Sequence, residues 1–180
     1  MEVTVCPRGL LQINNARIIF RNFSGEEGQF NREGERSFSL VIAGGIFDDG
    51  VHKPIEVDAQ EMAEALMAQT NMHGVGWNIK IKPPRTEEED PFMHMKVKVS
   101  TKNRMPAVYL SSAGNVRRLE EGDLWMLDEI AIRNVNLDIR PFDGEMRGEG
   151  FRSAYLDSIE VIQEIDRFTA RYAEEESPEE

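Results

Sequence analysis

The sequence predicts a mainly β protein, built as a small antiparallel barrel with one inserted helix and a disordered acidic C-terminal tail. Short stretches rich in β-branched and aromatic residues recur along the chain and end at Gly and Pro turns. A single stretch has the apolar spacing of an amphipathic helix. The last seven residues, EEESPEE, contain five glutamates and no basic residue, a composition that does not pack into a core.

We expect about seven strands, because that many stretches lie between turn-forming residues and favour extended backbone. They cover Ile13–Phe23, Arg36–Ile42, Trp77–Lys82, Phe92–Val99, Pro106–Leu110, Ile130–Phe142 and Gly150–Gln163. Residues 1–10 are expected to form a lead-in or a short edge strand, residues 115–128 a loop with a short turn, and residues 164–173 a short helix. Residues 143–149 contain Asp-Gly and Arg-Gly steps, which favour a hairpin between the last two strands.

The predicted helix covers Val57–Asn71. Asp58 is its natural N-cap and Glu61 follows three residues later, which completes a capping box, while Met62 and Leu66 lie on one apolar face. A single helix among many short strands favours an OB-fold-like barrel, in which the helix usually lies between the third and fourth strands.

Length and cysteine content limit the class of protein. The 180 residues suffice for one domain with a proper core, which we place at 1–173, followed by the disordered tail at 174–180. Cys6 is the only cysteine, which excludes an internal disulfide and a cysteine-based zinc cluster and fits a reducing cytoplasm. No apolar run approaches the roughly 18 residues of a membrane span, and the N-terminus lacks a signal-peptide core. We therefore expect a cytoplasmic protein without a membrane partner.

Charge is segregated along the chain. The formal net charge is -12, which by itself argues against a nucleic-acid partner. Residues 91–118, however, carry six Lys or Arg and no acidic residue, whereas the tail is purely acidic. Blocks of like charge usually stay solvated and available for interaction. Two interpretations of the tail therefore stay open, a simple solubility tail and a contact for a partner.

Residues 14–40 interleave arginines with phenylalanines at strand spacing. The residues are Arg17, Arg21, Arg32 and Arg36 with Phe20, Phe23, Phe30 and Phe38. A guanidinium binds a phosphate with two parallel donors and a phenyl ring stacks on a base, so the pattern suits an unpaired nucleic-acid strand. The alternative is that a strand pair buries these rings in the core.

Two later strands place lysines on their polar faces. Lys80 and Lys82 share one face of the first, and Lys96 and Lys98 share one face of the second with His94. If the two strands pair side by side, they form a basic surface that binds phosphates without reading sequence. The alternative is the solvated face of an ordinary sheet.

Sequence motifs for catalysis are missing. The chain has no G-x-x-x-x-G-K-[ST] phosphate loop, no H-E-x-x-H motif, no G-x-S-x-G elbow and no dinucleotide-binding glycine motif. His52, His73 and His94 fall in different elements without metal-ligand spacing. We therefore expect a protein that is not an enzyme and that holds no cofactor and no metal ion.

Six strings occur in a fixed order between Gln12 and Ala173. They are IIFRNFSGEEGQFNREGERSF, GWNIKIKPPR, PAVYL, IRPFDG, GFRSAYLDSIEV and DRFTARYA. In these strings the chain resembles the single-stranded DNA-binding proteins of tailed bacteriophages. The resemblance implies an OB-fold domain that coats unpaired DNA during phage DNA replication or recombination in the bacterial host cytoplasm. It also implies that the acidic C-terminal tail contacts other replication or recombination proteins.

Residue pattern and resemblance together predict a protein that binds and protects single-stranded DNA without strong sequence preference. Aromatic rings would stack on bases, and Lys and Arg would neutralise phosphates. The candidate DNA-binding residues are Phe20, Arg21, Phe23, Phe30, Arg32, Arg36, Trp77, Lys80, Lys82, Arg85, Lys96, Lys98 and Tyr109. Because neighbours along a strand face opposite sides, some of these residues must belong to the core.

Two functions of other classes stay open. An acidic protein that mimics DNA would inhibit a host nucleic-acid enzyme, and its surface charge would be uniformly negative. A metal-dependent nuclease would gather about three carboxylates, for which Asp48, Asp49 and the run Glu87–Asp90 are candidates. The oligomeric state stays open as well, and a homo-oligomer is compatible with the sequence.

Overall fold

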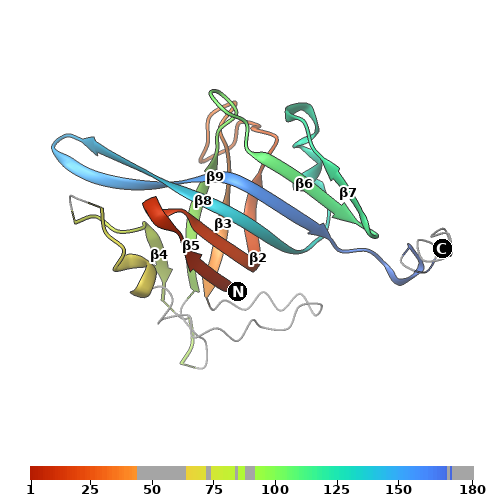
Figure 1. The fold of residues 1–180 in the computed structure, drawn as a ribbon, viewed down its shortest axis with the longest axis horizontal. Coiled ribbons are helices and arrows are strands. Elements are labelled where there is room, and N and C mark those ends of the chain that lie inside the picture. The colour runs from red at the N-terminus through yellow and green to blue at the C-terminus, as the bar shows by residue number, and fades with distance from the viewer. Residues whose placement is uncertain (44–63, 72–73, 84, 88–91, 170, 172–180) are drawn as a thin grey trace.

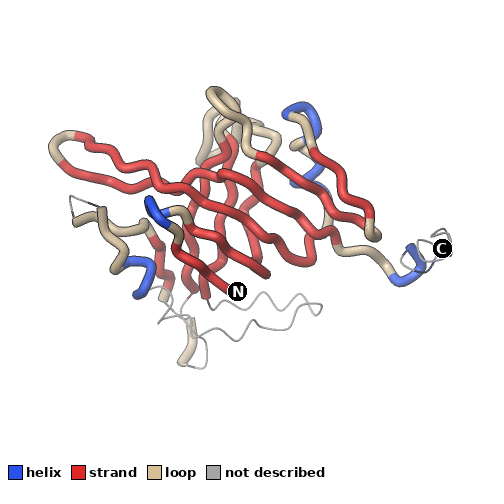
Figure 2. The backbone as a smooth tube through the Cα atoms, viewed as in Figure 1, coloured by secondary structure: helices blue, strands red, loops and turns tan. Residues whose placement is uncertain are grey.

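The computed structural model describes residues 1–43, 64–71, 74–83, 85–87, 92–169 and 171. Strands dominate this part of the chain, and its helices are short (Figures 1 and 2). The strands are β1 (Glu2–Val5), β2 (Leu11–Asn22), β3 (Arg36–Ala43), β4 (Ile79–Lys82), β5 (Phe92–Val99), β6 (Ala107–Ser112), β7 (Asn115–Arg118), β8 (Ile132–Met146) and β9 (Glu149–Gln163). The short helices are η1 (Pro7–Gly9), η2 (Glu121–Asp123) and α2 (Met126–Glu129).

Five of the strands close into a barrel. β2, β3 and β5 form an antiparallel meander, β8 pairs with the other edge of β2, and β9 pairs antiparallel with β8. A short parallel pair, Val97 with Ala154 and Lys98 with Tyr155, joins β5 to β9 and closes the ring. A closed five-stranded barrel with this Greek-key order is OB-fold-like, which confirms the predicted fold class.

The described residues contain two strands beyond the seven expected, one in a segment for which an edge strand was one of two expectations and one in a segment expected to be a loop. β1 lies within the segment expected to form a lead-in or an edge strand, and it pairs with β2. β7 lies within the segment expected to be a loop, and it forms a hairpin with β6. The β6–β7 turn uses Ala113 and Gly114, both with positive φ. All four residues of β7 are exposed, so the strand lacks the apolar alternation by which a sequence reveals a strand.

The β8–β9 hairpin is longer than the sequence predicted. Its strands continue to Met146 and resume at Glu149, so the turn contains only Arg147 and Gly148 rather than residues 143–149. Both turn residues have positive φ, which a two-residue hairpin of type I′ requires and which costs glycine nothing. The hairpin extends beyond the barrel as a two-stranded arm, at the left of Figure 1.

The core lies inside the barrel, and two bulges in β2 decide which residues of this strand enter it. The pairing register shifts between Ile13 and Ala16 and again between Ile19 and Asn22. Phe20, in the second shift, has φ 51° and is 61% exposed. Because a bulge re-aims the side chains that follow it, Phe20 points outward and Phe23 enters the core.

Part of the predicted helix lies within the described residues. Residues 64–67 are helical and Leu66 is buried, whereas the predicted cap of Asp58 and Glu61 and the tail 174–180 lie outside the described residues. The helical residues fall between the second and third barrel strands in chain order. Between the third and fourth barrel strands, where an OB-type barrel usually carries its helix, the chain forms β6, β7, η2 and α2.

Candidate nucleic-acid interface

The outward face of β4, β5, β9 and β8 gathers aromatic and basic side chains. On β5, the exposed Lys96 and Lys98 alternate with buried apolar residues. The pairing register carries this outward side to β4, where Lys80 pairs with His94, and to β9, where Tyr155 pairs with Lys98. We refer to this surface, together with one ring from β2, as the aromatic–basic strip. It consists of Phe20, Lys80, Lys82, Phe92, His94, Lys96, Lys98, Arg140, Phe142, Phe151 and Tyr155.

At the β4 end of the strip, three rings and one ammonium group form a cluster. The His94 ring stacks on Phe92 with centroids 5.1 Å apart, and the Phe20 ring meets His94 edge-on at 5.9 Å. The Lys82 Nζ lies 5.9 Å from the centre of the Phe20 ring. These neighbours leave His94 only 7% exposed, although it lies on the outward face of β5.

At the β9 end of the strip, the Tyr155 ring lies between two cations. The Lys98 Nζ is 5.7 Å and the Arg140 guanidinium carbon 5.2 Å from the ring centre, both within the range of cation–π attraction. The half-exposed Phe142 ring meets Tyr155 edge-on with centroids 5.9 Å apart. This end therefore combines ring faces suited to bases with charges suited to phosphates.

The arm continues the strip beyond the barrel. Phe151 is the register partner of Gly144, and its ring lies 6.3 Å from the Phe142 ring. A Cβ atom at Gly144 would come within 2.5 Å of the Phe151 ring. Glycine at this position therefore allows the ring to lie across the hairpin.

The other face of the arm is anchored by Arg152. Its Nε and Nη2 donate to the two carboxylate oxygens of Asp143 at 2.7 and 3.0 Å, and its Nη1 donates to the Gln69 carbonyl at 3.1 Å. The guanidinium also lies 5.2 Å from the centre of the Trp77 ring. Arg152 thus joins the base of the arm to the segment that precedes β4.

The loop between β2 and β3, residues 23–35, presents Phe30 and Arg32 to solvent. Phe30 is 88% exposed, and the Arg32 backbone N–H donates to the Glu35 carboxylate at 3.0 Å. In OB folds, this loop and the loop between the last two barrel strands flank the oligonucleotide-binding face of the second and third strands. Those strands are β3 and β5 here, so the loop, the strip and the arm occupy the corresponding places.

The cations of the strip are not neutralised by carboxylates in the part of the chain that the structure describes. None of the ion pairs found there engages Lys80, Lys82, Lys96, Lys98 or Arg140. Burial lowers the pKa of His94 below its ordinary value, and the positive charges of Lys82 and Lys80 lower that pKa further. This electrostatic environment suits an anionic ligand.

Two of the predicted stacking rings belong to the core. Phe23 is fully buried and stacks on Phe38 with centroids 5.3 Å apart. Trp77 is 3% exposed and lies under the Arg152 guanidinium. Neither ring presents a face to a base. The alternation of the strands required some of the candidates to belong to the core, and these two residues do.

Two of the predicted phosphate-binding arginines make contacts that hold the fold. Arg21 donates through Nη1 to the carbonyls of Leu127 and Ile130, both at 2.7 Å, and so binds the end of α2. Arg36 donates through Nε to the Phe23 carbonyl at 2.9 Å and so closes the base of the loop 23–35. The structure therefore places both guanidinium groups in internal contacts.

The remaining predicted residues divide between the strip and its surroundings. Phe20, Lys80, Lys82, Lys96 and Lys98 come together on the strip. Phe30 and Arg32 lie on the loop 23–35, and Arg85 is exposed in the segment that follows β4.

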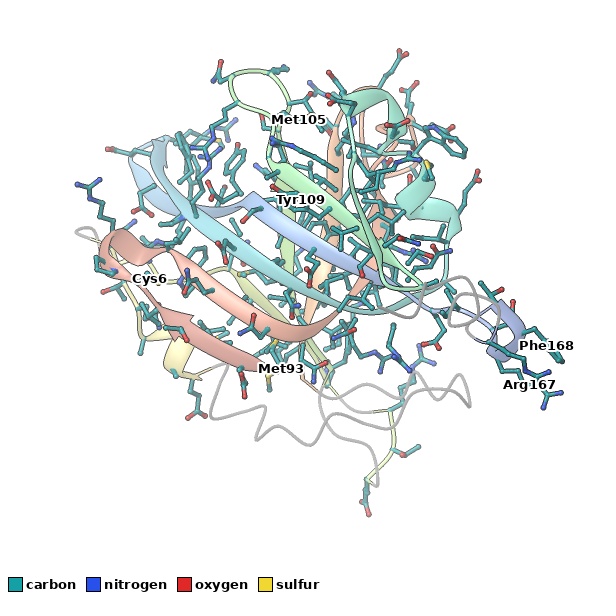
Figure 3. The ribbon with its side chains drawn as sticks, turned by 45° about the vertical axis from the view of Figure 1, so that its right-hand side comes forward. Cys6, Met93, Met105, Tyr109, Arg167 and Phe168 are labelled. Atoms are coloured by element: carbon teal, nitrogen blue, oxygen red, sulfur yellow. The ribbon has the colours of Figure 1, made fainter. Side chains whose placement is uncertain are left out.

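Tyr109 lies apart from the strip. It pairs with Glu160 on β9, five residues along the strand from Tyr155, which is roughly 16 Å at the rise of a β-strand. Its ring lies 6.0 Å from the Arg118 guanidinium. Figure 3 shows Tyr109 on β6, while Arg167 and Phe168 lie together on the helical turn after β9.

Six strip residues were not among the sequence candidates. They are Phe92, His94, Arg140, Phe142, Phe151 and Tyr155. Alternation does put Phe151 and Tyr155 on one face of their strand. However, only the parallel pairing of β9 with β5 shows that this face adjoins the lysines, and such a distant pairing leaves no local signal.

The described residues contain no group of three or more His, Cys, Asp or Glu side chains placed to hold a metal ion. The carboxylates proposed for a nuclease lie outside these residues, except Glu87, which is exposed. Within the described residues, we find no helix with the length and apolar character needed to span a membrane.

Comparison with known proteins gives one family and one set of similar folds. A model of the phage single-stranded DNA-binding domain matches residues 2–65 and 59–180. No curated protein matches the chain. The C-terminally truncated single-stranded DNA-binding protein of bacteriophage Enc34 is 16% identical with a TM-score of 0.51, covering 91% of each chain. The structure of that phage protein in complex with ssDNA is 17% identical with a TM-score of 0.52, covering 92% of this chain and 93% of that one.

Proposed function

The chain belongs to the phage single-stranded DNA-binding domain family, and on this premise we propose that it binds and protects single-stranded DNA without strong sequence preference. We place the binding on the aromatic–basic strip, flanked by the loop 23–35 and the β8–β9 arm. The supporting observation is the pairing register, which aligns rings and cations of several strands on one outward face. OB-type barrels bind oligonucleotides at the corresponding strands and loops.

Bases stack on the accessible rings in this proposal. Phe20 and Phe142 are exposed on the strip and Phe30 on the loop, while Tyr155 lies between two cations. A ring that stacks on a base contributes about 1–3 kcal/mol by alanine substitution, and every base offers a face for stacking. Binding without sequence preference follows from this tolerance.

Phosphates pair with the cations beside these rings. The cations are Lys80, Lys82, Lys96, Lys98 and Arg140 on the strip, with Arg32 and Arg85 at its margins. Each phosphate that a cation neutralises releases counterions, so the logarithm of the affinity falls with the logarithm of the salt concentration. For single strands the slope is about -0.7 per phosphate.

The test is a fluorescence-anisotropy titration with a labelled single strand and its duplex, at two salt concentrations and without added metal. We expect salt-sensitive binding that prefers the single strand. A protein that does not bind the single strand at low salt would contradict the proposal and favour the DNA mimic. Loss of the labelled strand after addition of magnesium would instead indicate a nuclease. We rank inhibition by DNA mimicry below single-stranded DNA binding, because a mimic presents uniformly negative charge whereas this strip is basic.

We propose that the acidic tail regulates DNA binding. We place the DNA-binding domain at 1–173 and assign the tail 174–180 two roles, contact with replication or recombination proteins in the host cytoplasm and competition with DNA for the strip. Deletion of residues 174–180 should then raise the affinity for single-stranded DNA at low salt. Unchanged affinity would remove the competitive role.

A further inference from the structure

His94 is a buried polar residue on the outward face of the barrel, and its ring has no hydrogen-bond partner in the part of the chain that the structure describes. It is 7% exposed, and neither Nδ1 nor Nε2 contacts a donor or an acceptor among the described residues. A buried polar group without a partner costs stability, and most such groups in proteins are paired. The position of His94 therefore calls for an explanation other than packing.

The charged groups around His94 are all positive within the described residues. β4 contributes Lys80, which is its register partner, and Lys82, and β5 contributes Lys96 two residues along the same face. On β3, the register partner of His94 is the uncharged Val41. On β2, Val41 pairs in turn with Arg17. The ligand that complements an imidazole in such surroundings is an anion.

Phe20 covers His94 and is held weakly in place. Its ring touches His94 edge-on and faces the Lys82 ammonium, yet it is 61% exposed and is not among the residues packed against the core. Its positive φ at a β-bulge is a conformation that phenylalanine rarely adopts. A change at Phe20 therefore gives up little packing and opens a path to the His94 ring.

We propose that His94, Lys80 and Lys82 form a phosphate-binding subsite beneath Phe20, which a nucleic-acid strand opens when the Phe20 ring moves onto a base. Phosphate binding in this subsite is coupled to protonation of His94. The inference rests on the proposed function and extends it, because it assigns one phosphate contact to a group that is neutral in the free protein at neutral pH.

The sign of the coupling follows from the two states of the protein. In the free protein, burial and the two lysines depress the pKa of His94. A phosphate beside the ring favours the imidazolium and raises that pKa in the complex. Between the two pKa values binding takes up a proton, so the affinity increases as the pH falls, by up to about tenfold for each pKa unit by which binding raises the pKa. Below both values the affinity becomes independent of this group.

The experiment measures proton uptake on binding of an oligothymidylate, whose base does not titrate between about pH 5.5 and 8, so that His94 is followed in its own range. Isothermal titration calorimetry in two buffers of different ionisation enthalpy gives the number of protons bound. The variant is His94→Gln, which keeps a polar side chain of similar size without titrating. The control is the double variant His52→Gln with His73→Gln, which removes the other two histidines of the chain. NMR titration of the His94 ring in the unmodified protein, free and bound, provides the same information without any substitution.

We expect the unmodified protein and the control to take up as much as one proton per occupied subsite when they bind the oligonucleotide. His94→Gln should lack the part of this uptake that belongs to His94. NMR should show a higher pKa for His94 in the complex than in the free protein. The inference is overturned if His94→Gln retains the full proton uptake, or if the His94 pKa is the same in both states. If the unmodified protein does not bind the oligonucleotide at low salt, the proposed function fails first, and the two failures are thereby distinguished.

Discussion

Lys98 and Tyr155 are register partners in the parallel pair that closes the barrel, and the Lys98 ammonium lies 5.7 Å from the centre of the Tyr155 ring. The two residues are 57 positions apart in the sequence (155 minus 98) and meet only because β9 pairs with β5. The same backbone contact that completes the barrel therefore places a ring beside the row of lysines. The pairing of β9 with β5 therefore both closes the barrel and assembles this end of the strip.

Replacement of Tyr155 tests whether that ring binds a base. Tyr155→Ala should weaken binding of single-stranded DNA about 5- to 150-fold, because a stacked ring contributes about 1–3 kcal/mol. Tyr155→Phe should retain most of the affinity, since stacking uses the ring rather than the hydroxyl group. Tyr109→Ala is the matched control, because Tyr109 is also a partly buried tyrosine beside an arginine but lies on β6 away from the strip. Anisotropy titrations of the four proteins decide the matter, and equal losses for the two alanine variants would contradict the proposed location.

Replacement of single lysines tests the phosphate contacts. Lys80→Ala and Lys98→Ala should each make the slope of log affinity against log salt shallower by about 0.7, the value for one phosphate of a single strand. Arg133→Ala is the control, because it removes one positive charge from a residue that pairs with Glu164 at 3.6 Å and is not part of the strip. Titrations across a salt series give the slopes. A lysine variant with weaker binding but an unchanged slope would show that its effect is structural.

Alternation predicted the faces of β4 and β5 correctly. The stretch Phe92–Val99 placed Lys96 and Lys98 opposite apolar residues, and the structure confirms the exposure of the two lysines, the burial of the apolar residues beside them and the pairing of β4 with β5. Burial departs from the alternation at His94, which is buried on the polar face, and at Ile81 of β4, which is exposed on the apolar face. Period-two alternation is a local property, so it is visible in one sequence. The barrel type was also predictable from the number and spacing of short strands, although the described part of the predicted helix does not lie between the third and fourth barrel strands.

The residues that the sequence misplaced depend on contacts between distant segments. Alternation places Phe20 and Phe23, three positions apart, on opposite faces of β2, but it does not show which of these faces is the core, and two bulges change the inward face along the strand. Arg21 looked like a phosphate ligand, but it binds carbonyls more than 100 positions away. Nothing in the residues around Arg21 signals that contact, since two bare carbonyls at the end of a short helix leave no sequence pattern.

Replacement of Asp128 tests how the loop 23–35 is held. The carboxylate of Asp128 accepts the backbone N–H of Phe23 at 2.7 Å through Oδ1 and that of Ser24 at 2.9 Å through Oδ2. Asp128→Asn keeps the shape but loses the charge and one acceptor, so it should lower the free energy of unfolding by about 1–2 kcal/mol. Glu129→Gln is the control, because it makes the same chemical change at the next, exposed residue. Urea denaturation measures both, and equal stability of the two variants would contradict the assignment.

The depressed pKa of His94 also predicts how stability depends on pH. In the unfolded chain His94 titrates near its ordinary pKa of about 6.5, whereas burial and then Lys82 and Lys80 lower the pKa in the folded protein. Between the two values the unfolded state binds more protons, so the free energy of unfolding decreases as the pH falls through this window, by about 1.4 kcal/mol for each unit of difference. Above the unfolded pKa the contribution of His94 is fully present, and below the folded pKa no further change from this residue occurs.

Urea denaturation of the unmodified protein and His94→Gln between pH 8 and pH 5, without DNA, measures this contribution as the difference between the two curves. Carboxylates shift both curves alike, so the difference isolates the histidine. We expect the variant to lose less stability on acidification than the unmodified protein, and the His52→Gln, His73→Gln control to follow the unmodified protein. Parallel curves for all three proteins would show that the pKa of His94 is not depressed in the folded protein. In that case any proton uptake by His94 on binding would result from the bound phosphate raising its pKa, without a contribution from burial and the two lysines in the free protein.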